Sequence, residues 1–275
     1  MKTIVFYKYQ GNGNDFIVID NRQQQVNGLS SDIIRSLCHR QFGIGADGLI
    51  LMHASGEYDF IMQYFNSDGR ESTMCGNGGR CIVRFAQHLA LITDRARFLA
   101  VDGPHEAIIR KDGLIMLKMK DVAVVTLKGE DFVLDTGSPH YVRFAEHVHM
   151  LHVPDESRKI RNAEEFVKEG INVNFVEMQE GKLFVRTYER GVEDETLSCG
   201  TGVVAAALVS SIKSGSEAGR QNVAVETPGG YFEVSFLKKQ DGGFSDIWLI
   251  GDARLVFKGE VEIPSSNPYP LKITT

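Results

Sequence analysis

The chain has 275 residues, 43% of them hydrophobic and 24% charged, with a formal net charge of -6 at pH 7. This composition is typical of a globular protein with one large or two medium domains, and it argues against a disordered or fibrous chain. The acidic balance and the absence of a Lys/Arg cluster argue against a nucleic-acid partner.

Neither export nor membrane insertion is expected. The apolar run that begins at Thr3 reaches Lys8 too soon to form a signal peptide. The longest stretch of small apolar residues, Val203 to Ile212, is shorter than the roughly 18 residues that a membrane-spanning helix requires. Four cysteines without a Cys-x-x-Cys pair favour neither a disulfide scaffold nor a structural zinc site. We therefore expect a cytoplasmic protein that holds no metal.

Strand-like stretches dominate the chain and predict a sheet-rich protein. They cover residues 3–9, 16–20, 49–52, 60–65, 106–110, 114–119, 172–178 and 183–188. Glycine-containing turns such as Lys111-Asp112-Gly113 and Asp241-Gly242-Gly243 separate apolar runs, as hairpin turns do. We expect antiparallel pairing.

Three helices are predicted. Residues 31–41 carry an apolar stripe behind a serine cap, and residues 79–91 repeat apolar side chains at helical spacing. Residues 202–214 are small and apolar on nearly every face until Gly215, which is typical of a helix enclosed on all sides. We expect this last helix to lie inside a sheet.

An internal repeat divides the chain into two halves. Residues 71–78 read ESTMCGNG and residues 195–202 read ETLSCGTG, so Cys75 and Cys199 stand 124 residues apart in the same context. Each copy follows a strand and opens a predicted helix. We expect an N-terminal half over residues 1–122, completed by residues 263–275, and a C-terminal half over residues 123–262.

This repeat has the chemistry of an epimerase. A cysteine at a strand-to-helix junction lies at the positive end of the helix dipole, which favours the thiolate. The glycines beside Asn77 and Thr201 let backbone N–H groups approach a carboxylate. If the halves face each other, one thiolate can remove an α-proton while the opposite thiol protonates the other face. The residues thus predict an α-carbon epimerase that needs no pyridoxal cofactor.

Several ordered motifs resemble those of the diaminopimelate epimerase family over nearly the whole chain. They are residues 11–16 (GNGNDF), 42–48 (FGIGADG), 65–66 (FN), 74–81 (MCGNGGRC), 170–173 (GINV), 188–191 (YERG) and 198–202 (SCGTG). The resemblance implies an α+β fold of two pseudo-symmetric halves, each a mainly antiparallel sheet or barrel wrapped around a central helix. It also implies a homodimer and the cofactor-independent interconversion of LL- and meso-diaminopimelate, on the route to lysine and peptidoglycan.

Carried over motif by motif, the resemblance implies that Cys75 and Cys199 are the acid–base pair. Donors to the reacting carboxylate would be Gly76, Asn77, Gly200 and Thr201. The amino groups and the distal carboxylate would be bound by Asn14, Asn66, Asn172, Glu189 and Arg190, with His140 close to the reacting centre. Arginine suits this task because its guanidinium can grip a carboxylate with two hydrogen bonds.

Three positions depart from the family pattern. Ser138 stands where asparagine is common, Gly48 stands where some members have glutamine, and the loop over residues 191–196 is one residue longer than in many members. None of these changes removes a catalytic group. They bear on the detailed substrate contacts.

Three other functions stay open at this point. A two-cysteine racemase for proline or hydroxyproline would use the same geometry, although Arg190 with Asn66 and Asn172 favours a substrate with a second polar end. A thiol redox module would join Cys75 to Cys199 in a reversible disulfide. A non-catalytic binding protein would leave the two matched thiols unexplained.

Other candidate residues have a structural interpretation. Cys38 and Cys81 lie on apolar helix stretches, which predicts core positions. A carboxylate at Glu71 or Glu195 precedes a helix and favours its dipole whether or not it acts on a substrate. Residues 43–48 fit Gly-x-Gly-x-x-Gly but follow a helix, the reverse of the dinucleotide-binding order. Three nearby histidines have no matching ligand cluster: His147, His149 and His152.

Overall fold

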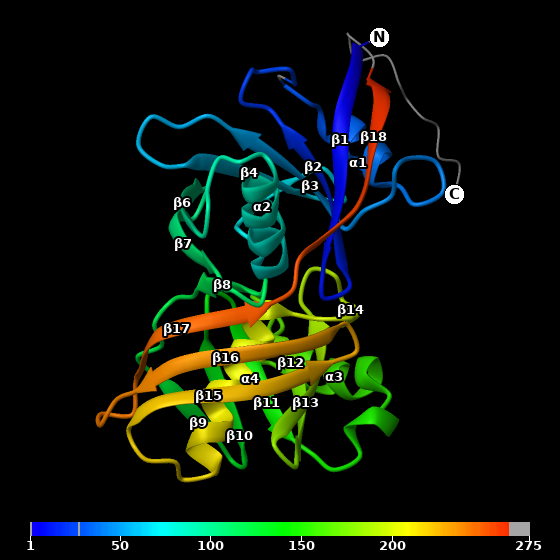
Figure 1. Cartoon of the computed structure of the whole chain (residues 1–275). Helices are drawn as coiled ribbons and strands as arrows, with labels where there is room; N and C mark the ends of the chain where they lie inside the picture. Colours follow the sequence, from blue (N-terminus) through cyan, green and yellow to red (C-terminus); the bar gives the residue numbers. More distant parts are fainter. Residues whose placement is uncertain (1, 27, 264–275) are drawn as a thin grey trace. The chain divides into compact units, whose positions relative to one another are not determined.

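The computed structural model describes residues 2–26 and 28–263 and divides into two units by its internal contacts (Figure 1). Unit 1 holds the chain up to Ile115 and from Ala253 onward, and unit 2 holds Met116–Asp252. Both divisions fall earlier than residues 122 and 262, in part because β18 (Arg254–Ile263) pairs along its length with β1 (Lys2–Gly11). Residues 264–275, expected to complete the first half, lie outside the described residues.

Unit 1 carries one half of the repeat. Its elements in chain order are β1, β2 (Asn14–Asp20), α1 (Ser31–Cys38), β3 (Gly48–His53), β4 (Phe60–Asn66), β5 (Glu71–Ser72), α2 (Gly76–His88), β6 (Arg95–Ala100), β7 (Gly103–Ile109) and β18. Antiparallel pairs join β1 to β2 and β18, β3 to β4, β4 to β5, and β6 to β7. β2 and β3 are parallel, as are β4 and β6.

Unit 2 carries the other half. After β8 (Ile115–Lys118), which lies at the unit boundary, come β9 (Val125–Lys128), β10 (Asp131–Asp135), β11 (Pro139–Phe144), the 3-10 helix η1 (Val148–Met150), α3 (Val153–Arg161), β12 (Asn172–Gln179), β13 (Lys182–Glu189), β14 (Asp194–Thr196), α4 (Gly200–Lys213), β15 (Gly219–Thr227), β16 (Gly230–Lys238) and β17 (Phe244–Gly251). β11 and β12 are parallel, as are β13 and β15.

The two units share one order of strand pairing. In unit 1 the order β2, β3, β4, β5 is parallel once and antiparallel twice, and β11, β12, β13, β14 follow the same order in unit 2. Each parallel pair is separated in sequence by a helix, because parallel neighbours need a crossover connection. The predicted α+β fold with mainly antiparallel sheets is confirmed, and these parallel pairs are the exception to the expected pairing.

Of the four α-helices described, α1 begins at a side-chain cap. Ser30 Oγ accepts a hydrogen bond from the Ile33 amide at 3.3 Å and starts α1. The two helices of the repeat begin at Gly76 and Gly200, a few residues before the predicted starts. α4 contacts strands β10 to β13 and β15 to β17 and is buried along nearly its whole length, so the expected helix enclosed by a sheet is confirmed (Figure 1).

Both cysteines assigned to the core are buried there. Cys38 is 3% exposed and Cys81 is fully buried. Burial raises the pKa of the Cys38 thiol to about 12, so this thiol stays protonated at neutral pH. In the part of the chain that the structure describes, no helix has the length and apolar character needed to cross a membrane.

Candidate functional site

Cys75 and Cys199 occupy the same position in the two units. Each is the N-cap residue of its helix and has an extended backbone, with φ -81° and ψ 130° at Cys75 and φ -117° and ψ 111° at Cys199. Their carbonyls accept the first helical hydrogen bonds, from the Gly79 amide at 2.7 Å and from the Val203 amide at 2.9 Å. Both side chains are thiols and neither is joined in a disulfide. Each junction therefore presents a thiol at the positive end of a helix.

In unit 1 the predicted substrate residue Asn14 lies beside Cys75. The Cys75 thiol donates to Asn14 Oδ1 across 3.6 Å, and Asn77 Nδ2 donates to the same oxygen across 3.4 Å. Asn14 Nδ2 in turn donates to Asp47 Oδ2 at 2.5 Å. The amide of Asn14 is thus oriented by an acidic side chain behind it.

That acidic side chain belongs to a charged cluster. Arg40 pairs with Asp15 at 2.9 Å and with Asp47 at 2.6 Å, and Lys8 pairs with Asp15 at 2.8 Å. Burial alone would raise the pKa of Asp15, but hydrogen bonds from Arg40 and Lys8 lower it to about 2. At neutral pH the cluster behind Asn14 therefore contains ion pairs between Asp15 and the basic residues Arg40 and Lys8.

Arg80 is a site residue that the sequence interpretation did not assign. It is fully buried on α2, and its guanidinium donates to Asn77 Oδ1 at 2.8 Å and to Asn12 Oδ1 at 2.7 Å. These bonds hold Asn77, a predicted carboxylate donor, to the loop between β1 and β2. The signal available in the sequence was an arginine on the apolar helix of the MCGNGGRC motif.

In unit 2 a chain of hydrogen bonds leads away from Cys199. Thr201 Oγ1 lies 3.4 Å from Cys199 Sγ and 2.9 Å from His140 Nε2. Asn174 Nδ2 lies 3.0 Å from His140 Nδ1, and Thr187 Oγ1 donates to Asn174 Oδ1 at 2.9 Å. Burial lowers the pKa of His140 to about 3, so its ring is neutral at physiological pH. Asn174 and Thr187 were not predicted.

The other predicted residues of unit 2 lie on neighbouring segments. Asn172 Nδ2 donates to Ser138 Oγ at 2.9 Å and to the Pro139 carbonyl at 3.1 Å, while its Oδ1 accepts from the Arg190 amide at 3.0 Å. Glu189 Oε1 accepts from Thr196 Oγ1 at 2.5 Å. Arg190 is exposed. The roles of Asn172, Glu189 and Arg190 toward a substrate stay predictions, as does that of Asn66, which is exposed at the end of β4.

Two departures from the family pattern have a structural counterpart. The Ser138 hydroxyl accepts from Asn172, so it contributes to this unit's own hydrogen bonding. A Cβ atom at Gly48 would lie 2.5 Å from the Tyr64 ring and 2.5 Å from the Phe65 carbonyl oxygen. Glutamine at position 48 therefore requires β3 and β4 to shift relative to each other.

The strand residues beneath the two helix starts differ in chemistry. In unit 1, Ile50 pairs across β3 and β4 with Tyr64. In unit 2, Asn174 pairs across β12 and β13 with Thr187. Asn174 follows Ile50, and His140 follows Phe16, by the same 124 residues that separate the two cysteines. A buried triplet of mainly hydrophobic side chains, Phe16, Ile50 and Tyr64, is thus matched by a buried polar triplet, His140, Asn174 and Thr187.

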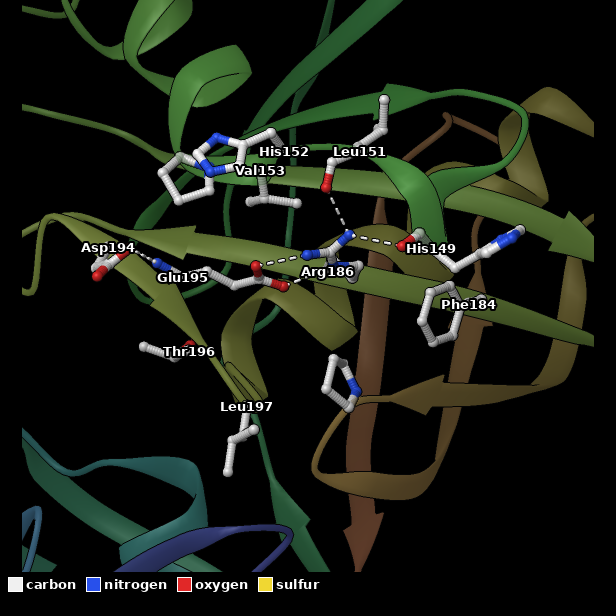
Figure 2. A pocket seen from close by; sticks show the side chains of 12 residues that line it. His149, Leu151, His152, Val153, Phe184, Arg186, Asp194, Glu195, Thr196 and Leu197 are labelled. Atoms are coloured by element: carbon white, nitrogen blue, oxygen red, sulfur yellow. Dashed lines mark hydrogen bonds and ion pairs between the residues drawn. The ribbon is translucent and has the colours of Figure 1, made fainter.

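A pocket of about 650 Å³ opens on unit 2 beside β14 (Figure 2). Figure 2 shows Arg186 between the carboxylate of Glu195 and the backbone oxygens of His149 and Leu151. Arg186 Nε and one terminal nitrogen bind the two Glu195 oxygens at 2.6 and 2.7 Å. This pairing favours the structural interpretation of Glu195. The pocket's lining includes none of the predicted substrate residues.

Among residues 2–26 and 28–263, no group of three or more His, Cys, Asp or Glu side chains could hold a metal ion. His147, His149 and His152 are exposed. His152 lies 2.9 Å from Asp155, which follows it on α3.

Comparison with solved structures places the fold in a class of two-unit α+β proteins. A PhzF-family phenazine biosynthesis protein of Bacillus anthracis matches with a TM-score of 0.73 at 15% identity, covering 96% of this chain and 100% of that one. A hydroxyproline epimerase of Agrobacterium vitis matches with a TM-score of 0.65 at 13% identity, covering 94% and 92%. At these identities the likeness concerns the fold alone.

Sequence comparison is more specific. The diaminopimelate epimerase family matches residues 6–125 and 132–256. A diaminopimelate epimerase of Flavobacterium psychrophilum is 47% identical over 92% of this chain and 98% of its own length. One of Aquifex aeolicus is 38% identical over 93% and 97%. The chain belongs to the diaminopimelate epimerase family.

Proposed function

We propose that this protein interconverts LL- and meso-diaminopimelate in lysine biosynthesis, without a pyridoxal cofactor, and that Cys75 and Cys199 are its two acid–base groups. One observation carries the proposal: each unit holds a cysteine thiol as the N-cap of a matching helix. Family membership over both units supports the same reaction.

The proposed mechanism moves one proton at a time. The sulfur that is a thiolate removes the α-proton, and the electron pair of the broken C–H bond spreads onto the carboxylate. Backbone N–H groups at the helix starts, from Gly76 and Asn77 in unit 1 and from Gly200 and Thr201 in unit 2, stabilise the developing charge. The other thiol then delivers its proton to the opposite face of the carbon, which inverts the centre.

The substrate class follows from the remaining polar groups. Diaminopimelate has a second amino-acid end, which needs its own binding residues in the protein. Proline has no such end and needs no such residues. Asn66, Asn172, Glu189 and the exposed guanidinium of Arg190 are the residues we assign to that end. Arg190 supports the assignment because a guanidinium can bind a carboxylate with two parallel hydrogen bonds.

The protein is further proposed to act as a cytoplasmic homodimer. Three consecutive apolar residues of β18, Leu255, Val256 and Phe257, are between 40% and 55% exposed. Exposed apolar side chains that lie close together often mark a surface that a partner covers. Sedimentation as a dimer at micromolar concentration is the expected result, and a monomer at all concentrations would contradict the assignment.

The direct test is α-proton exchange in heavy water. Reduced protein is incubated with LL-diaminopimelate without added cofactor, and the α-proton signal is followed by NMR. Loss of the signal with formation of the meso isomer is expected. Turnover of proline but not of diaminopimelate would instead support the racemase, and no exchange with either would favour a redox or binding function.

The redox alternative has its own test. Oxidation that joins Cys75 to Cys199 removes both proton carriers, so activity should disappear and return with reductant. Unchanged epimerisation with the disulfide fully formed would contradict the two-thiol mechanism.

A further inference from the structure

The buried polar triplet of unit 2 fixes the direction of its hydrogen bonds. The Tyr141 carbonyl can only accept, and Asn174 Nδ2 donates to it at 3.0 Å. The same amide nitrogen faces His140 Nδ1 at 3.0 Å. On its other side Asn174 Oδ1 accepts from the Thr187 hydroxyl. The amide of Asn174 therefore has one orientation, in which His140 Nδ1 is an acceptor.

This orientation selects one form of the His140 ring. Because Nδ1 accepts, it carries no hydrogen, which excludes the imidazolium and leaves the neutral form with its hydrogen on Nε2. That hydrogen is donated to Thr201 Oγ1, 2.9 Å away. The Thr201 hydroxyl then accepts on its His140 side, and its own hydrogen can be donated to Cys199 Sγ, 3.4 Å away.

We propose that Asn174 is a positioning residue, which holds His140 in the Nε2–H form and so turns the Thr201 hydroxyl toward Cys199 as a donor that stabilises the thiolate. The role rests on the function proposed above, in which Cys199 alternates between thiolate and thiol. A hydrogen bond donated to a thiolate favours the charged form over the neutral one.

Two charged groups act on His140 in opposite directions. Asp135, at the end of β10, favours a protonated His140, and Arg190, after β13, disfavours it. His140 and Asn174 are both fully buried, so they interact with each other more strongly than with solvent. In unit 1 the matching positions hold Phe16 and Ile50, which can orient no hydroxyl.

The test measures the thiols without any substrate. Iodoacetamide alkylation of Cys199 and Cys75 is followed peptide by peptide across pH in the full-length, reduced protein, in wild type and in Asn174→Leu. We expect the Cys199 pH profile in the variant to shift upward by about one pKa unit, which slows alkylation about tenfold below the midpoint. Cys75 in the same sample should keep its profile.

A matched control separates this role from loss of a buried amide. Asn21 of unit 1 is 1% exposed, and its side chain exchanges two hydrogen bonds of 2.7 Å with the backbone of Val26. Asn21→Leu removes comparable buried bonds, yet should leave the Cys199 profile unchanged. Equal shifts in both variants would overturn the proposal.

Two further measurements keep the proposal testable if Asn174→Leu fails to fold. In wild type labelled with ¹⁵N-histidine, and assigned by the signal lost in His140→Gln, NMR should show His140 protonated at Nε2; protonation at Nδ1 would overturn the proposal. Thr201→Val should shift the Cys199 profile as Asn174→Leu does, and Thr201→Ser should restore it. Because no readout uses diaminopimelate, a negative result differs from failure of the proposed reaction.

Discussion

The two cysteine junctions have the same backbone and different supports. Beneath the start of α2 the strand residues Phe16 and Ile50 are apolar, and the Phe16 ring packs edge to face on the Tyr64 ring at 6.0 Å. Beneath α4 the side chains form a hydrogen-bonded network around Asn174. The two halves therefore share the helix start that presents each thiol and differ in the layer of strand side chains beneath that helix start. Two equivalent positions in a fold need not have equal chemistry.

The largest expected effect concerns the thiols themselves. Cys75→Ala and Cys199→Ala should each lower the epimerisation rate more than about a thousandfold, because a positioned acid or base contributes 10²–10⁴-fold. Each variant retains one of the two bases. We therefore expect each variant to exchange the α-proton of one isomer slowly without inverting it, and the isomer should differ between the two variants. Cys38→Ala, at a buried core thiol, is the matched control and should epimerise normally. NMR in heavy water measures both quantities.

The glycines of the two helices should differ in their tolerance of alanine. A Cβ at Gly202 would lie 2.3 Å from the buried Asn174 Oδ1, whereas at Gly78 the nearest atom would be Ile50 Cδ1 at 3.3 Å. We expect Gly202→Ala to lose about 2 kcal/mol of unfolding free energy and Gly78→Ala less than about 1 kcal/mol. Urea denaturation compares them. Equal losses would contradict the difference between the two layers.

The polar layer should also make unit 2 sensitive to acid. The folded pKa of His140 is about 3, below its ordinary value of 6.5, so between these values the unfolded chain binds a proton that the folded chain does not. Stability from this group is therefore present above pH 6.5 and is lost as the pH falls, by about 2 kcal/mol at pH 5. His140→Gln should remove this part of the pH dependence in denaturation experiments at pH 7.5 and pH 5.

The smallest expected effect separates the two glutamates of the repeat. Glu195 is held by Arg186 through two hydrogen bonds, while Glu71 is exposed. Glu195→Gln should lose about 1 kcal/mol and Glu71→Gln less than about 0.5 kcal/mol, with epimerisation nearly unchanged in both. A large loss of activity in either variant would instead indicate a catalytic role for that carboxylate.

The sequence predicted the helices of the repeat and missed features that depend on distant residues. The apolar run after Gly202 was sufficient to predict an enclosed helix. The parallel pairs were not expected, because local patterns do not reveal which strands become neighbours across a helix. α3 was missed although Pro154 lies in its first turn and Asp155 follows, both typical of a helix start.

The candidate site residues were assigned from motifs, and residues that are recognised only by their burial were not assigned. Asn14 and His140 were assigned from motifs and lie beside Cys75 and Thr201. Asn174 belongs to the strand-like stretch of residues 172–178, and its partners on β11 and β13 explain a buried amide there. Asparagine is uncommon inside strands, and this was the one local signal.

The close approach of Gly202 to Asn174 makes the residue at each of these positions depend on the other. Once an amide oxygen fills the space above residue 202, no larger residue fits there without moving it. Conversely, an aliphatic side chain at position 174 would leave His140, Thr187 and the Tyr141 carbonyl without this hydrogen-bonding partner. Replacing the polar arrangement by the apolar one would therefore need substitutions at several of these positions together.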